Sequence, residues 1–253
     1  MRCVIVAALS TASDLHNVER NLARFPSSWD RICLAHEHIR SPPGACDHLL
    51  LHKGYGWSSL LNVTRGLTSA CTDVALLLDD VRLDTDPELV LDDMHAHELD
   101  VASPRVAGAS HVFMRTALPL KRIRCVLRSR MIEYFATFFA PRAWQCFLAL
   151  LSADAFGTAT GGLGWGYDTC HAAACPNDSF GVLLHANASH LQNSKRWPMP
   201  HPPARSGRRL TLRRIPERIE QANRLKQWTR RAHNADCLHG TWTSPVDAIT
   251  CTA

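Results

Sequence analysis

The sequence predicts an α/β fold built on an open, mainly parallel sheet that helices flank. Apolar runs alternate with amphipathic stretches through the first half of the chain, as they do when strands and helices take turns. Val74–Leu78 is a continuous apolar run, which is typical of a strand buried on both faces. Two helix starts are marked, one by Ser13 or Asp14 as a cap and one by Pro87 in a first turn.

Each segment of the first half has its own pattern. Val4–Leu9 is far too short for a signal anchor and lacks a small-residue cleavage pattern, so it indicates a buried first strand. Leu15, Val18 and Leu22 recur at helical spacing and predict one apolar helix face. The predicted strands are Val4–Leu9, Arg31–Ala35, His48–His52, Val74–Leu78 and Val101–Ser103, the last ended by Pro104. The predicted helices are Ser13–Arg24, Trp57–Leu67 and Pro87–His97.

The second half changes character and ends in a basic extension. The predicted elements are a strand at Met131–Phe139, helices at Pro141–Ser152 and Thr169–Ala174, a strand at Gly181–His185 and a basic helix at Ile215–His233. Prolines between 198 and 203 mark a linker, and the last twenty residues have the composition of a loop. We therefore expect one folded domain over residues 1–195 and a linker, basic helix and tail over 196–253.

The net charge of +5 is concentrated in the C-terminal segment. Lys and Arg residues crowd the stretch 195–231, where only Glu217 and Glu220 oppose them. Such a segment attracts phosphates without sequence specificity, so a nucleic-acid-binding protein is one alternative. More often a basic run is a solvated helix or contacts an acidic partner.

The cysteines and the hydropathy bear on the compartment. The ten cysteines include no Cys-x-x-Cys pair, which disfavours a zinc site of the usual spacing. Several lie in apolar segments, where a thiol behaves as a small hydrophobe, so we expect reduced thiols. No stretch approaches the roughly 18 apolar residues of a membrane span. The expected protein has no transmembrane span and is cytoplasmic.

Two adjacent acids follow the apolar run, in the segment Leu78-Asp79-Asp80. In open α/β sheets, ligands bind beyond the carboxyl ends of the strands. Adjacent carboxylates there repel each other unless a cation or protein donors neutralise them. Carboxylate oxygens suit Mg²⁺ or Mn²⁺, which in turn bridge substrate phosphates. The alternative is a pair of turn acids with no ligand, and Asp84 is a weaker candidate nearby.

A glycine-rich loop carries a second group of candidates, in Gly161-Gly-Leu-Gly-Trp-Gly-Tyr-Asp168. Its glycines let the backbone approach a ligand closely, and Trp165 and Tyr167 offer flat faces for a sugar ring. Asp168 could act as a general base toward an acceptor hydroxyl. Alternatively, it caps the next helix. A third candidate is His185, which ends the last apolar strand and gains weight only if that strand lies beside Asp79-Asp80.

The order of these motifs resembles the GT-A glycosyltransferases over residues 3–190. The stretch Glu133–Trp144 and the loop that ends in Trp165-Gly-Tyr-Asp168 look especially like an uncharacterised GT-A-like group of plants and bacteria, which also shows a Lys-x-x-x-Trp like Lys53–Trp57. The family's acidic motif places Asp at both ends of a three-residue frame. Here that frame is Leu78-Asp79-Asp80, so the first acid is missing.

The resemblance implies a metal-dependent transfer of a sugar from a nucleotide-diphospho donor, such as a UDP-sugar, to the hydroxyl of a glycan or another acceptor. Asp80 and His185 would bind Mn²⁺ or Mg²⁺, and Asp168 would be the base of an inverting reaction. The implied donor-binding residues are Leu9, Ser10, Thr11, Lys53, Trp57, Asp79 and Asp80, and the implied acceptor-binding residues are Glu133, Trp165 and Tyr167.

Two enzyme classes compete with this assignment. A metal-dependent hydrolase stays open because the same carboxylates could activate water. A Rossmann dehydrogenase is disfavoured, because the turn after the first strand, Ala8-Leu-Ser-Thr-Ala-Ser13, has no Gly-x-Gly-x-x-Gly.

Overall fold

The computed structural model describes residues 1–9, 13–35, 39, 43–51, 63–107, 124–129, 132–152, 171–172, 174–191 and 246–252. Its strands are β1 (Arg2–Leu9), β2 (Trp29–Ala35), β3 (His48–Leu51), β4 (Asp73–Leu78), β5 (Val81–Leu83), β6 (Val101–Ala107), β7 (Arg124–Ser129), β8 (Ala136–Phe139), β9 (Phe180–His190) and β10 (Val246–Thr252). Its helices are α1 (Leu15–Leu22), α3 (Arg65–Thr68), α4 (Pro87–Ala96) and α6 (Pro141–Ser152).

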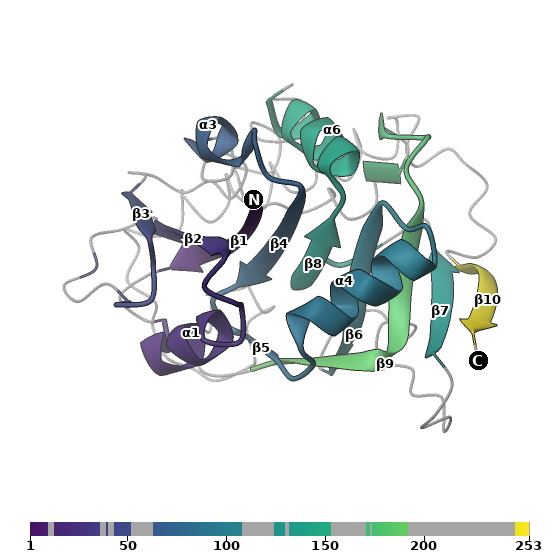
Figure 1. Ribbon diagram of the computed structural model, residues 1–253, viewed down its shortest axis with the longest axis horizontal. Coiled ribbons are helices and arrows are strands. Elements are labelled where there is room, and N and C mark those ends of the chain that lie inside the picture. The colour runs from purple at the N-terminus through teal and green to yellow at the C-terminus, as the bar shows by residue number, and fades with distance from the viewer. Residues whose placement is uncertain are drawn as a thin grey trace, which may run out of the picture.

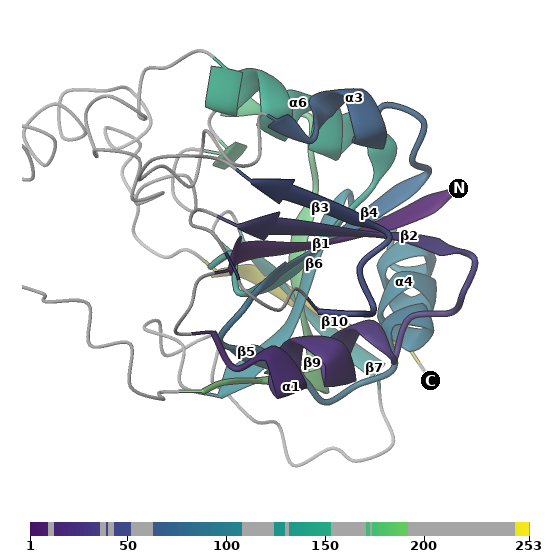
Figure 2. The same cartoon turned by 90° about the vertical axis from the view of Figure 1, so that its left-hand side faces the viewer.

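The strands form one mixed sheet that helices cover on both faces. The order is β10-β7-β9-β6-β8-β4-β1-β2-β3, and β5 pairs with β9 off this path. Strands β3, β2, β1 and β4 are parallel neighbours, whereas β8 runs antiparallel to both β4 and β6. Figure 2 shows α3 and α6 on one face and α1 and α4 on the other. The predicted open α/β sheet flanked by helices is confirmed (Figure 1), but the sheet is mixed and not mainly parallel, because β5, β7, β8 and β10 all make antiparallel pairs.

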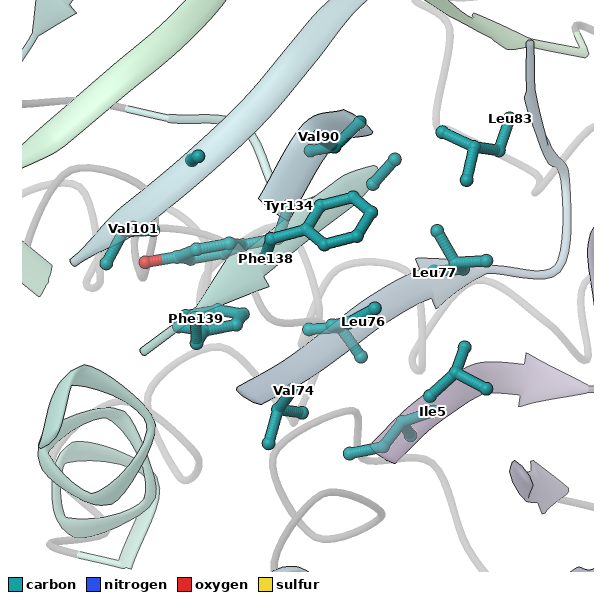
Figure 3. Packing of buried hydrophobic residues seen from close by; sticks show 14 of the residues in the cluster. Ile5, Val74, Leu76, Leu77, Leu83, Val90, Val101, Tyr134, Phe138 and Phe139 are labelled. Atoms are coloured by element: carbon teal, nitrogen blue, oxygen red, sulfur yellow. The ribbon is translucent and has the colours of Figure 1, made fainter. Parts of the chain in front are cut away.

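The apolar run that predicted a buried strand lies in the centre of the sheet. In β4, Val74, Ala75, Leu76 and Leu77 are fully buried, because β1 and β8 flank the strand and helices cover both of its faces. Figure 3 shows side chains of β4, β8 and α4, including Phe138 and Val90, packed together in this core. Burial of these apolar side chains supplies the main driving force for folding and fixes where β4 ends.

Helix starts follow the predicted capping residues. The Asp14 carboxylate accepts the backbone N–H of Asn17 at 3.2 Å and caps α1. At α4, Asp86 is the cap and Pro87 occupies the first turn, where its missing N–H costs no hydrogen bond. Both helices therefore begin within two residues of the predicted starts. Within the described residues, no helix has both the length and the apolar character needed to cross a membrane.

Several strands differ from the prediction for local reasons. Pro104 was expected to end its strand, but it lies inside β6 opposite Leu183, and the register shifts directly after it. The predicted strand Met131–Phe139 is extended only from Ala136 onward, with a turn at 134–135. Strands β5 and β7 had no sequence signal. The strand predicted to end at His185, β9, continues to His190.

The C-terminal residues return to the sheet. The tail was expected to be a loop, but residues 246–252 form β10 and pair antiparallel with β7, with Cys251 opposite Cys125. The predicted division at residue 195 stays a prediction, and any boundary there must allow the last strand to join the first domain's sheet. The predicted helix Trp57–Leu67 falls mostly outside the described residues, as does the basic helix Ile215–His233.

The expectation of reduced thiols is wrong for the described cysteines. Disulfides join Cys3 to Cys71, Cys33 to Cys46, and Cys146 to Cys175, and Cys125 is also disulfide-bonded. Their apolar surroundings suit a half-cystine as well as a thiol, so local sequence does not separate the two states. The Cys3–Cys71 bond ties the start of β1 to the residues that lead into β4, the two strands next to each other in the core.

We expect the Cys3–Cys71 bond to stabilise the fold more than the Cys33–Cys46 bond. The first closes a separation of 68 residues and the second one of 13. The chain-entropy model then gives losses of about 4 and about 3 kcal/mol on removal. Denaturant unfolding of the paired Cys3→Ser/Cys71→Ser and Cys33→Ser/Cys46→Ser variants measures both. Equal unfolding free energies for wild type and the first variant would contradict this expectation.

Candidate active site

The acidic pair lies at the carboxyl end of β4, beside the carboxyl end of β1. Asp79 is buried, its backbone N–H donates to the carbonyl of Ala7 in β1 at 3.2 Å, and the Ser13 hydroxyl donates to its carboxylate. Ser13 follows the β1–α1 connection, which contains the predicted donor-binding residues Ser10 and Thr11. The structure therefore brings Asp79 and the end of that connection together. Leu9 itself is a buried residue of β1.

A histidine lies beside Asp80, but it is His190 and not His185. The Nε2 atom of His190 is 3.1 Å from Oδ2 of Asp80. The pairing of β5 with β9 brings them together, since Val81 is opposite His190 and the N–H of Leu191 donates to the carbonyl of Asp80 at 2.8 Å. A carboxylate and an imidazole that are 110 residues apart in the sequence thus meet at one edge of the sheet.

The turn before β8 also contacts the residues around Asp80. The Phe135 ring lies against His190 with ring centroids 4.7 Å apart, and its carbonyl accepts the N–H of Leu78 at 3.0 Å. Glu133, a predicted acceptor-side residue, belongs to the same segment; its side chain is buried and its carbonyl accepts the N–H of Phe135. The antiparallel pairing of β4 with β8 therefore brings the backbone of the segment that contains Glu133 to Leu78, the residue before the acidic pair.

One oxygen of Asp80 is suited to a ligand. Oδ2 contacts His190, whereas Oδ1 is buried and makes no hydrogen bond within the described structure. A buried carboxylate oxygen without a partner loses the hydration that it would have in water. A divalent cation would restore that stabilisation, and a carboxylate with an imidazole is a donor set for divalent first-row metal ions. The residues present fit a metal ion here.

His185 contacts a different carboxylate from the one that was predicted. Its Nε2 pairs with the carboxylate of Asp93, a buried residue of α4, and so joins β9 to the helix that covers this face of the sheet. His97, the residue that caps the C-terminal end of α4, is also buried, and burial lowers its pKa while Asp93 opposes that effect. In the described structure His185 thus pairs with Asp93, and the histidine that contacts Asp80 is His190.

The position of His190 on the same strand had a signal in the sequence. From Leu184 to Ser189, apolar and polar residues alternate strictly, and the structure buries Leu184, Ala186 and Ala188. Such alternation is typical of a strand with one buried face, so it extends the predicted strand past His185. Asp84, the weaker candidate, pairs with Arg82 at 2.6 Å and accepts the Ser189 hydroxyl at 2.8 Å.

The remaining predicted site residues lie outside the described residues. These are Ser10, Thr11, Lys53, Trp57, Trp165, Tyr167 and Asp168. Their roles stay predictions.

The segment that follows the glycine-rich loop is held by a buried histidine. Nδ1 of His171 is 2.6 Å from the hydroxyl of Tyr134, and the ring packs among Phe139, Phe147 and Phe180. Burial lowers the pKa of His171 to about 3, so the ring is neutral and can accept the tyrosine hydroxyl. Tyr134 is adjacent to Glu133, and His171 follows Asp168 by three residues, so this bond joins the two predicted acceptor-side segments.

A cluster of Cys146, Cys175 and Asp178 also places three ligand atoms within 4.8 Å of one another. The two sulfurs are bonded to each other, so neither is a thiolate that could bind a metal. The third member, Asp178, has its pKa raised by burial and by the nearby Asp100. We assign this cluster a structural role.

Comparisons with known proteins support the fold. No family model matches the sequence, and no curated protein matches it. Among solved structures, the chain is similar to GalNAc-T7 with UDP, GalNAc and Mn²⁺, at a TM-score of 0.55 and 9% identity, over 96% of this chain and 52% of that one. It is also matched to the UDP-glucose pyrophosphorylase from Acinetobacter baumanii, at a TM-score of 0.46 and 7% identity, over 75% and 88% of the two chains.

The likeness to GalNAc-T7 shows the fold. This chain has a Rossmann-like GT-A fold, with a mixed sheet between two layers of helices. It spans about half the length of the GalNAc-T7 structure.

The buried His171 predicts an acid-sensitive fold. Because its pKa lies near 3 in the folded chain and near 6.5 when unfolded, the unfolded chain binds the proton first as the pH falls below 6.5. Folding stability is then lost between pH 6.5 and 3, by roughly 2–3 kcal/mol at pH 4.5 from this group. Unfolding of wild type and His171→Gln at pH 7 and 4.5 measures it; equal losses in the two proteins would refute the assignment.

Proposed function

We propose that this chain is a metal-dependent glycosyltransferase that uses a nucleotide-diphospho sugar, such as a UDP-sugar, and a hydroxyl acceptor. The observation that carries the proposal is the Asp80–His190 pair at the carboxyl end of β4, where a buried carboxylate oxygen has no hydrogen-bond partner among the described groups. Open α/β sheets bind their ligands at this edge. The GT-A fold supports the same substrate class, since the similar GalNAc-T7 structure contains UDP and Mn²⁺.

Asp80 and His190 would hold the metal, and Mn²⁺ fits them better than Mg²⁺. Mg²⁺ prefers oxygen ligands, whereas imidazole is more acceptable to Mn²⁺. A bound divalent ion would offset the negative charge that develops on the departing diphosphate. Asp79, held between Ala7 and Ser13, lies where the end of the β1–α1 connection meets the acidic turn, which suits its predicted role on the donor side.

The acceptor side would be built by Glu133 and the loop that carries Trp165, Tyr167 and Asp168. Asp168 is proposed as the base that deprotonates the acceptor hydroxyl in an inverting reaction. The neutral His171 and its bond to Tyr134 would keep the end of this loop next to the Glu133 segment. A metal-dependent hydrolase is separated from a transferase by product analysis with and without an acceptor.

The disulfides change the expected compartment. The cytoplasmic expectation rested on reduced thiols and on the lack of a recognisable signal peptide or membrane span, and the disulfides in the described part of the chain remove the first of these premises. Protein disulfides persist in oxidising environments and are rare where glutathione and thioredoxin keep thiols reduced. We propose that the chain works in an oxidising compartment.

Binding of metal and nucleotide tests the revised ligand set. We expect His190→Ala to weaken Mn²⁺-dependent binding of UDP at least about ten-fold, as loss of groups around a metal commonly does. His185→Ala, which removes the contact with Asp93, should leave that affinity unchanged. Titration calorimetry of both variants with UDP, with and without Mn²⁺, is the measurement. Loss of affinity in His185→Ala alone would restore His185 as the metal ligand.

Transfer kinetics test the base. Asp168→Asn should lower the rate of sugar transfer by about 10²–10⁴-fold, the usual contribution of general base catalysis. Donor binding, followed separately by calorimetry, should stay unchanged. If transfer proceeds at the wild-type rate, Asp168 is not the base.

A further inference from the structure

Two buried asparagines connect α1 to the acidic turn. Asn17 and Asn21 lie one helical turn apart and are 2% and 1% exposed. They share the buried face of α1 with Val18 and Leu22. An aliphatic side chain would fill such a face without the penalty of burying an amide, so the retained amides call for a specific contact.

Both amides bind the backbone of β5. Nδ2 of Asn21 donates to the carbonyl of Val81 at 2.6 Å, and its Oδ1 accepts the N–H of Leu83 at 3.0 Å. Nδ2 of Asn17 donates to the same carbonyl of Val81 at 2.9 Å and to the carbonyl of Asp79 at 3.3 Å. Both lone pairs of the Val81 carbonyl are thereby used.

These contacts replace a strand partner. Strand β5 pairs with β9 through Val81, Arg82 and Leu83, and its other edge faces α1. In a sheet, the carbonyl of one residue and the N–H two residues later point to the same neighbour. Asn21 donates to that carbonyl, of Val81, and accepts that N–H, of Leu83, as a residue of an adjacent strand would. The three-residue strand is therefore held along both edges, by β9 and by α1.

We propose that Asn17 and Asn21 are positioning residues that fix the acidic turn against His190. Asp79 and Asp80 directly precede β5, and Asn17 binds the carbonyl of Asp79 itself. The same helix begins directly after its cap Asp14, and Ser13, the residue before the cap, binds the Asp79 carboxylate. Helix α1 and the residue before its cap thus hold Asp79 at two points, its backbone carbonyl and its side-chain carboxylate.

The positioning role of the two asparagines does not depend on the proposed function. Only its expected effect on metal and nucleotide affinity rests on that proposal. If the turn shifts, Asp80 moves relative to His190, and the two proposed metal ligands lose their mutual geometry. Groups that orient metal ligands typically change metal affinity by 10–100-fold when removed. The position of Asp80 against His190 is itself measurable without any ligand.

The test compares Asn21→Leu with Val90→Ala. Leucine keeps the size of Asn21 and removes both hydrogen bonds, whereas Val90 is a fully buried residue of α4 whose truncation also destabilises the core. NMR of the His190 ring in the ligand-free protein reports the geometry, and calorimetry with Mn²⁺ and UDP reports the affinity. We expect Asn21→Leu to shift the ring resonances and weaken binding about ten-fold, and Val90→Ala to do neither.

Each outcome decides between the two proposals. An unchanged His190 resonance in folded Asn21→Leu overturns the positioning role, whatever the affinity. Absence of Mn²⁺-dependent UDP binding in wild type overturns the proposed function, while the ring resonance still decides the role of Asn21. If Asn21→Leu fails to fold, Asn17→Ser provides the same test, because it removes the bond to Asp79 and leaves both bonds of Asn21.

Discussion

The candidate site depends on the pairing of the short strand β5 with the end of β9. This pairing sets Val81 opposite His190 and gives Asp80 its imidazole neighbour, although 110 residues separate the two side chains in the sequence. Strand β4 supplies the carboxylates, and its place in the core determines where they emerge. The turn at 134–135 and helix α1 then close the corner, the first through Phe135 and the second through backbone contacts to β5.

Sequence patterns predicted the parallel half of the sheet because each of its strands carries a local signal. The wholly apolar run of β4 and the capped start of α4 can be recognised without knowledge of their neighbours. The acidic pair was found for the same reason, since a strand end followed by carboxylates is a local feature. Three-residue β5 and the terminal β10 exist only through their partners, so no window of the sequence marks them.

Side-chain roles were harder to predict than elements. His185 and His190 lie on one strand, and only the partner of each imidazole, Asp93 or Asp80, distinguishes their roles. Asn17 and Asn21 look like solvated positions of an amphipathic helix until the strand beneath them is known. The state of the cysteines was equally hard to predict, because an apolar neighbourhood suits a thiol and a disulfide alike. The pairing of Cys3 with Cys71 joins residues that are far apart in the sequence, so no local pattern indicates it.

The central claim is that Asp80 and His190 bind a divalent ion that in turn binds a nucleotide diphosphate. Crystals grown with Mn²⁺ and UDP test it most directly, because anomalous scattering at the manganese edge locates the ion without reference to the fold. We expect an anomalous peak bound by Asp80 and His190, with the diphosphate of UDP beside it. A peak at His185 and Asp93, or UDP bound at another edge of the sheet, would contradict it.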